Sequence, residues 1–226
     1  MKFIIISLVL ISSVILIAQK NSDTGYINLN QIKIQKNSDL FKIDNSANEQ
    51  LLVLEGNQYN EEVDNFTGKN IDDVSGKIIL FGYPIRNYSM SVDMKFLGIN
   101  IDFLGGGWFG FALRAQDLEN YEIVWFMPGG VESDNTIAHV PVAHKIVPWW
   151  TEAYENQEKG NFKLPQNDWF TARVEVIGDE FSVYVNEQFI FKKKLTYYLI
   201  SGTPGLFVGT ATDVVFRRIK IEEIKK

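Results

Sequence analysis

The chain has 226 residues, no cysteine and a formal net charge of −6, with 46% hydrophobic and 13% aromatic residues. The lack of cysteine excludes disulfide bonds, so an apolar core must stabilise the fold, and the aromatic content can supply one. The acidic balance argues against nucleic acid as a partner, because phosphate backbones are bound by clustered lysines and arginines. The basic runs at 192–194 and 225–226 are interpreted as a solvated edge and tail.

Residues 1–18 predict a signal peptide. Met-Lys is followed by an almost wholly apolar run, and Ala18 is a small residue at a plausible cleavage position. A retained membrane anchor is the alternative, although a span normally needs about 20 apolar residues. We therefore expect an exported protein, periplasmic, at the cell surface or extracellular, without stable membrane insertion after cleavage. The mature chain, residues 19–226, has the length of a single domain.

Period-two alternation dominates the mature chain, and no segment of helical length has an apolar face. Residues 26–34 and 51–54 are predicted as strands, whereas residues 57–73 are polar and predict a surface loop. Clear strands are expected at 88–96, 109–115, 121–126, 169–177, 181–186, 189–191, 205–209 and 214–221. Many short strands with turn residues at regular spacing predict an all-β fold, an antiparallel two-sheet sandwich.

The segment at about 127–168 is the exception, and we interpret it as a long loop insertion. It follows neither a helical nor a strand period, and a long segment of this kind in a compact domain is usually a binding loop, a lid or disorder. Disordered tracts are poor in aromatics. This segment instead combines both histidines of the chain with three aromatic residues: His139, His144, Trp149, Trp150 and Tyr154. The sequence therefore places the candidate site here.

The sequence lacks the motifs of conventional hydrolase and cofactor chemistry. Gly105, Gly107 and Gly110 match G-x-G-x-x-G, but the residues that follow alternate as a strand, whereas a dinucleotide site needs a helix. There is no paired-acid strand motif of a retaining glycosidase and no G-x-S-x-G elbow. The spacing of the two histidines matches no zinc signature, so we expect no metal and no cofactor. Calcium held by loop side chains stays open as an alternative, with Glu132, Asp134 and Asn135.

The aromatic residues of the loop have two interpretations. Exposed rings flanked by polar side chains suit sugars, because the apolar face of a pyranose stacks on an aromatic ring while its hydroxyls need fixed polar partners. Alternatively, the loop folds its own aromatics onto the sandwich as a satellite core. Trp150 and Tyr154 are the better candidates for stacking on a ligand.

The order of the motifs carries a family resemblance. Residues 110–126, the histidine-containing loop, and residues 167–170, 181–186, 205–209 and 216–221 resemble the concanavalin A-like lectin/glucanase superfamily. Within it, the chain is most similar to the laminin G-like and 3-keto-glycoside hydrolase-like domains of exported bacterial proteins. The resemblance implies a jelly roll of two antiparallel sheets that binds carbohydrate on its concave sheet and by rim loops.

The resemblance does not carry over the hydrolysis of the glucanase branch. The acid motif of the glucanases is missing, and the Glu-x-Gln pattern of the keto-glycoside branch keeps only its acid, Glu122.

Three functions follow from these observations. The first is an exported protein that recognises carbohydrate or polysaccharide on a concave sheet and a rim loop. Its ligand-binding residues would be Arg114, Tyr121, Trp125, His139, His144, Trp149, Trp150, Glu152 and Tyr154. The second is a glycoside hydrolase or lyase acting on 3-keto sugars, with His144 or Glu152 as general base and Arg114 polarising the keto oxygen. The third is an envelope module for protein–protein contacts, which would show a contiguous apolar patch.

Overall fold

The computed structural model describes two antiparallel sheets and one short 3-10 helix, η1 (Leu29–Gln31). The described residues are 25–31, 41–46, 48–55, 77–99, 107–128, 135–144, 157–159, 162, 164–197, 199–209 and 212–225. Among them, no helix is long and apolar enough to cross a membrane. The predicted signal peptide and the predicted loop at 57–73 lie outside the described residues.

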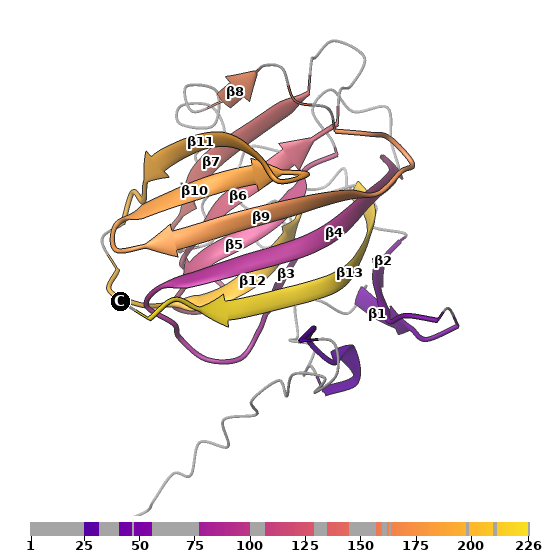
Figure 1. The fold of residues 1–226 in the computed structure, drawn as a ribbon, viewed down its shortest axis with the longest axis horizontal. Helices are drawn as coiled ribbons and strands as arrows, with labels where there is room; N and C mark the ends of the chain where they lie inside the picture. The colour runs from indigo at the N-terminus through magenta and orange to yellow at the C-terminus, as the bar shows by residue number, and fades with distance from the viewer. Residues whose placement is uncertain are drawn as a thin grey trace, which may run out of the picture.

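The first sheet has seven strands and faces the viewer in Figure 1. In spatial order its strands are β1 (Phe41–Asp44), β2 (Leu51–Leu54), β13 (Thr212–Glu223), β4 (Tyr88–Ile99), β9 (Phe170–Ile177), β10 (Glu180–Val185) and β11 (Gln188–Lys194).

The second sheet lies behind the first and has six strands. In spatial order they are β3 (Lys77–Leu80), β12 (Thr203–Val208), β5 (Phe109–Ala115), β6 (Tyr121–Met127), β7 (Thr136–Val142) and β8 (Gln157–Lys159). The predicted all-β, two-sheet sandwich is therefore confirmed.

The main core lies between the two sheets, where the inward side chains of both meet. Phe109 of β5 illustrates this packing, because its ring stacks on Phe96 of β4 with the centroids 5.8 Å apart. It also contacts the rings of Phe170 at 6.2 Å and Phe216 at 6.5 Å. Strands β9 and β10 alternate strictly between buried and half-buried residues. The period-two pattern of the sequence thus indicates a sheet with one buried face and one face exposed to solvent.

A second apolar cluster covers the outer face of the six-stranded sheet. In β6, Glu122 and Val124 point into the main core, so Tyr121 and Trp125 point the opposite way. We call this group the outer apolar cluster, and all of its members are buried: Ile78, Ala112, Ala115, Tyr121, Ile123, Trp125, Ala138, Val140, Val142 and Phe207.

Burial on both faces explains why the sequence predicted a loop where β7 lies. All seven residues of β7 are buried, so its apolar residues do not alternate with polar ones. Pro141 further weakens the strand pattern. The interpretation of 127–168 as one long loop was therefore wrong for β7, and for the short strand β8 as well. The strand predicted at 26–34 was also wrong, since η1 occupies part of it.

Gly110 shows what the glycine-rich stretch does in this fold. A Cβ atom at this position of β5 would lie 2.1 Å from the carbonyl oxygen of Val124 in β6, so only glycine fits between the paired strands. Gly107 has a φ of +95° just before the strand begins. Gly105 lies outside the described residues. Gly107 thus lies at the entry to the strand, as the sequence predicted, and Gly110 allows the close pairing of β5 with β6.

Candidate functional site

Arg114, the central residue of the predicted site, is fully buried at the end of β5. Its guanidinium donates hydrogen bonds to the carbonyl oxygens of Leu199 at 2.7 Å and Gly178 at 2.9 Å, and also to that of Ile200. We expected this side chain to meet ligand hydroxyls. The structure shows instead that its guanidinium N–H groups donate to backbone carbonyls. These hydrogen bonds connect the loop after β9 with the loop before β12.

His139 and Glu122 form a buried pair between the sheets. On β7, His139 lies opposite Val124 of β6, so it is a diagonal neighbour of Glu122. Its Nε2 is 2.5 Å from Glu122 Oε2. The carboxylate also accepts the backbone N–H groups of Thr196 and Tyr197, both at 2.8 Å. His139 is only 3% exposed. This pair is thus an interior anchor for the chain that follows β11 and does not line the surface.

Tyr121 and Trp125 lie together, but inside the outer apolar cluster. The ring of Trp125 packs against that of Trp108 with the centroids 6.1 Å apart. Among the described residues, the buried indole nitrogen of Trp125 has no hydrogen-bond partner. Both predicted ligand contacts are therefore shielded from solvent, at 1% and 2% exposure.

The remaining predicted residues do not complete a site among the described residues. His144 is exposed just after β7, and its backbone N–H donates to Asn120 Oδ1 at 3.1 Å. Asn135 contacts the chain ahead of β9, where its Oδ1 accepts a hydrogen bond from the backbone N–H of Leu164 at 3.3 Å. In the described part of the chain, no three potential metal-binding side chains cluster. The other predicted residues lie outside the described ranges: Glu132, Asp134, Trp149, Trp150, Glu152 and Tyr154.

Burial raises the pKa of the Tyr88 and Tyr121 hydroxyls above the ordinary tyrosine value near 10. In the unfolded chain these groups ionise first as the pH rises, so the folding stability they contribute is complete below about pH 10 and is lost above it. Above about pH 10, we expect the free energy of unfolding to fall by up to about 1.4 kcal/mol per pH unit for each tyrosine. Denaturant unfolding between about pH 9 and pH 11 measures this slope. The Tyr121→Phe protein should lose part of the slope, and an unchanged slope would contradict the assignment.

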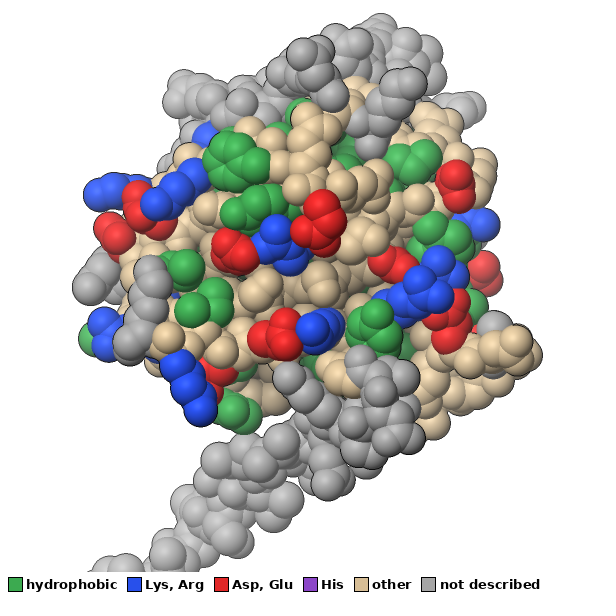
Figure 2. All heavy atoms as spheres, in the orientation of Figure 1, with side chains coloured by type: hydrophobic (Ala, Val, Ile, Leu, Met, Phe, Trp, Pro, Cys, Tyr) green, Lys and Arg blue, Asp and Glu red, His purple; other side chains and the backbone are tan. Residues whose placement is uncertain are grey.

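A surface of mixed aromatic and charged side chains lies on the outer face of the seven-stranded sheet. Figure 2 shows this face, where acidic, basic and apolar side chains gather over β4, β9, β10 and β13. The strand registers bring its residues into rows, because directly paired residues of antiparallel strands point to the same side. One row is Arg217, Asp93 and Thr171, and the next is Lys220, Ser91, Arg173, Tyr184 and Phe189. We call this surface, together with Trp169, Glu49, Arg218, Glu175 and Glu187, the polar sheet face.

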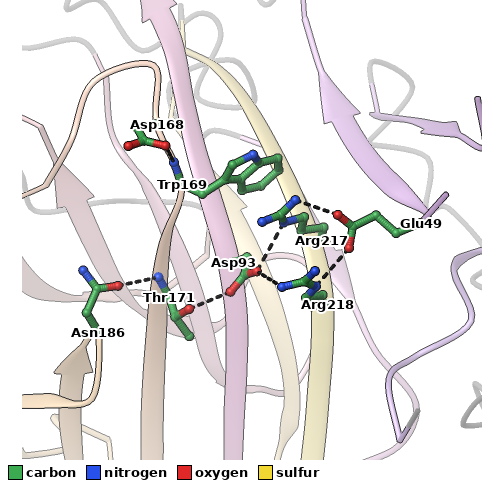
Figure 3. Close-up of polar contacts among 8 residues, drawn as sticks. All are labelled: Glu49, Asp93, Asp168, Trp169, Thr171, Asn186, Arg217 and Arg218. Carbon is green, nitrogen blue, oxygen red and sulfur yellow. Dashed lines mark hydrogen bonds and ion pairs between the residues drawn. The ribbon is translucent and has the colours of Figure 1, made fainter. Parts of the chain in front are cut away.

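Trp169 and Arg217 form one end of the polar sheet face (Figure 3). The guanidinium carbon of Arg217 lies 3.9 Å from the centroid of the half-buried Trp169 ring, a cation–π distance. Arg217 Nε also pairs with Asp93 Oδ2 at 3.2 Å, and Thr171 donates its hydroxyl to Asp93 Oδ1 at 2.6 Å. A half-buried aromatic ring and a hydroxyl thus lie beside a carboxylate that is only 8% exposed.

Glu49 closes the same network from the turn between β1 and β2. Its two oxygens accept Arg217 Nη1 at 2.6 Å and Arg218 Nε at 2.9 Å. Two consecutive strand residues normally point to opposite faces, but β13 bulges between Arg217 and Lys220, and Arg218 has a φ of +50°. The bulge lets both arginines reach the same carboxylate, as Figure 3 shows.

Tyr184 and Arg173 repeat this arrangement on the neighbouring strands. The guanidinium carbon of Arg173 lies 3.7 Å from the centroid of the Tyr184 ring, and the Tyr184 hydroxyl donates to Glu175 Oε2 at 3.2 Å. Phe189, which is 54% exposed, lies beside Tyr184 with the ring centroids 5.7 Å apart. The polar sheet face therefore has a second aromatic platform with a fixed polar rim.

The sequence predicted the wet face of β4 but did not identify the polar sheet face as a site. Asp93 stood among the polar residues that alternate with the apolar ones, and such residues are usually only solvated. Its partner Arg217 is 124 positions away and Glu49 is 168 positions from Arg217. Only the pairing of β4 with β9 and β13 brings these residues together. The one local indication was Trp169, a large aromatic at a strand entry.

No family model and no curated protein matches the sequence. Among solved structures, the chain is similar to the alginate lyase Aly36B, with a TM-score of 0.54 and 10% identity over 92% of this chain and 96% of that chain. It is also similar to a functionally unknown protein from Saccharomyces cerevisiae, with a TM-score of 0.51 and 11% identity over 82% and 93% of the two chains. The carbohydrate-binding module CBM66 from Bacillus subtilis has a TM-score of 0.50 and 17% identity over 66% and 83%.

Likeness at these identities shows the fold alone. The lyase and the carbohydrate-binding module belong to the concanavalin A-like lectin/glucanase fold. The chain therefore has the two-sheet sandwich of that fold.

Proposed function

We propose that the protein recognises carbohydrate and that the polar sheet face is its binding surface. The observation that carries this proposal is Trp169, half-buried at the surface, with Arg217, Asp93 and Thr171 fixed around it. A sugar needs an apolar ring on which to stack and polar groups that meet its hydroxyls in fixed directions. The ion pairs hold these side chains in place before any ligand arrives, which reduces the entropy lost on binding.

The shared fold supports a carbohydrate ligand without specifying one. CBM66 is described as a carbohydrate-binding module, and Aly36B as an alginate lyase. Because function resides in sites and not in folds, the weight of the proposal rests on the polar sheet face. We also propose that the protein is exported, on the basis of the apolar segment at residues 1–18.

The described geometry favours binding over turnover of 3-keto sugars. Arg114, the residue expected to polarise a keto oxygen, is committed to backbone carbonyls in the interior. Likewise, the polar character of the sheet face differs from the contiguous apolar patch expected of a module for protein contacts. Among the described residues, no arrangement comparable to the one around Trp169 supports either alternative.

The Trp169→Ala protein is expected to lose binding to soluble polysaccharides. Removing a central aromatic contact typically costs about 2 kcal/mol, which corresponds to roughly a 30-fold weaker affinity. Affinity gel electrophoresis with a panel of polysaccharides finds the ligand, and titration calorimetry then measures the change. Tyr83→Ala is the matched control, since Tyr83 is an exposed aromatic residue (43%) outside the rows of the polar sheet face. Equal affinities of the two folded variants would refute this site.

A further inference from the structure

We infer that the glycan bound by the polar sheet face is neutral, and that polysaccharides bearing carboxylate or sulfate groups are disfavoured there. This inference rests on the proposed function and names the class of ligand. It follows from the way in which the charges of this face are already paired with one another.

The arginines at the Trp169 end are paired with carboxylates of the protein. Arg217 contacts both Glu49 at 2.6 Å and Asp93 at 3.2 Å. Arg218 contacts the same two carboxylates, at 2.9 Å and 3.5 Å. A carboxylate or sulfate on the ligand would therefore either displace Asp93 or Glu49 from its cation, or bind beside a carboxylate of like charge, and both are unfavourable.

The cations farther along the face are paired in the same way. Arg173 contacts Glu175, and it lies 3.3 Å from Glu187. Lys220 lies 2.9 Å from Glu222. In total, five carboxylates meet four cations across these pairs. These pairs thus carry no excess of positive charge to attract an anionic polymer, and the whole chain is acidic as well.

Hydroxyl groups suit this face better than charged groups do. A carboxylate that is already paired keeps free lone pairs, and a guanidinium has five N–H donors, so both can add a hydrogen bond to a hydroxyl without breaking their ion pair. A sugar hydroxyl both donates and accepts, and it can bridge the two. A neutral glycan therefore gains hydrogen bonds at the polar sheet face without the cost of separating charges.

Small hydroxyl side chains occupy the middle of the face. Ser89 and Ser91 of β4 lie between Glu222 and Lys220 of β13 on one side and Glu175 and Arg173 of β9 on the other. The long charged side chains thus flank a strip of short ones that follows β4. This arrangement fits a short neutral oligosaccharide lying along β4 and ending at Trp169.

Pairs of polymers that differ only in charge test the inference. We expect the protein to bind the neutral member at least tenfold more tightly than the anionic one, for example methyl-esterified against de-esterified polygalacturonate, or dextran against dextran sulfate, in about 0.15 M salt. Tighter binding of the anionic members, abolished in Trp169→Ala, would overturn the inference but leave the proposed function intact. Failure to bind any neutral or anionic polymer in the panel would overturn the proposed function itself.

A substitution that unpairs the arginines tests the stated cause. Glu49→Gln removes the carboxylate shared by Arg217 and Arg218, so its affinity for the anionic polymers should rise by up to about fivefold, the scale of an exposed ion pair. Glu223→Gln is the matched control, because it makes the same charge change next to Glu222 but outside the pairs of this face. If both variants behave alike, local pairing does not set the preference.

Discussion

The Glu122→Ala protein is expected to be less stable than the wild type by about 3 kcal/mol or more, because a donor left without its acceptor at a buried site costs about 1 to 3 kcal/mol. Glu122 is fully buried and accepts hydrogen bonds from Thr196 and Tyr197 while it contacts His139. Alanine removes the acceptor of the buried imidazole and of the backbone N–H groups of Thr196 and Tyr197. It also leaves a cavity between the sheets.

Denaturant unfolding of the purified proteins measures this loss. Glu122→Gln keeps the size of the side chain and one oxygen acceptor, so it should lose less stability than Glu122→Ala. Glu223→Gln, an exposed carboxylate of β13, should stay within about 0.5 kcal/mol of the wild type. A loss below about 1 kcal/mol in Glu122→Ala would show that the pair is not an anchor.

Arg114→Met is expected to destabilise the fold by about 3 kcal/mol or more, since hydrogen bonds made by a charged group contribute about 1.5 to 3 kcal/mol each. Methionine preserves most of the apolar stem, but it cannot donate to the carbonyls of Gly178, Leu199 and Ile200. The loops after β9 and before β12 then lose the hydrogen bonds that connect them through Arg114.

The loss should therefore be local as well as global. Hydrogen exchange in Arg114→Met should accelerate first at the loop that contains Leu199 and Ile200, before the core strands β4 and β9 respond. Arg114→Lys retains a cationic donor and should recover part of the stability. An Arg114→Met protein with wild-type stability and wild-type exchange in that loop would contradict the structural role of the guanidinium.

The sequence predicted the strands that are exposed to solvent on one face, because burial of the other face makes apolar and polar residues alternate. Strands β4, β9 and β10 lie close to where the alternation placed them. Strand β7 was missed, since all of its residues are buried and His139 lies among apolar neighbours. A pattern of polarity cannot reveal a strand on which both faces are covered.

The placement of Arg114 failed for a different physical reason. Simple alternation after Phe111 and Leu113 predicts an outward side chain at position 114. The pairing of β5 with β12 shifts register at this end of the strand, and Arg114 has a φ of +51°. Arg218 lies at a comparable irregularity of β13. Irregularities of this kind redirect a side chain and leave no trace in the hydrophobic pattern.

The polar sheet face could not be predicted from the sequence, because its residues come from segments that are far apart in the chain. Glu49, Asp93, Trp169 and Arg217 come from the β1–β2 turn, β4, the chain just before β9, and β13. Glu49, Trp169 and Arg217 are each an ordinary half-exposed residue, and Asp93 is a buried carboxylate. Only the strand order and register show that they share one surface.

The position of a bound oligosaccharide tests the central claim most directly. In a crystal structure of the protein with a neutral oligosaccharide selected from the binding panel, we expect a sugar ring against Trp169. Its hydroxyls should lie within hydrogen-bond distance of Asp93 or Arg217, on the outer face of β4, β9 and β13. A sugar bound instead on the outer face of the six-stranded sheet, against Tyr121 and Trp125, would contradict the account.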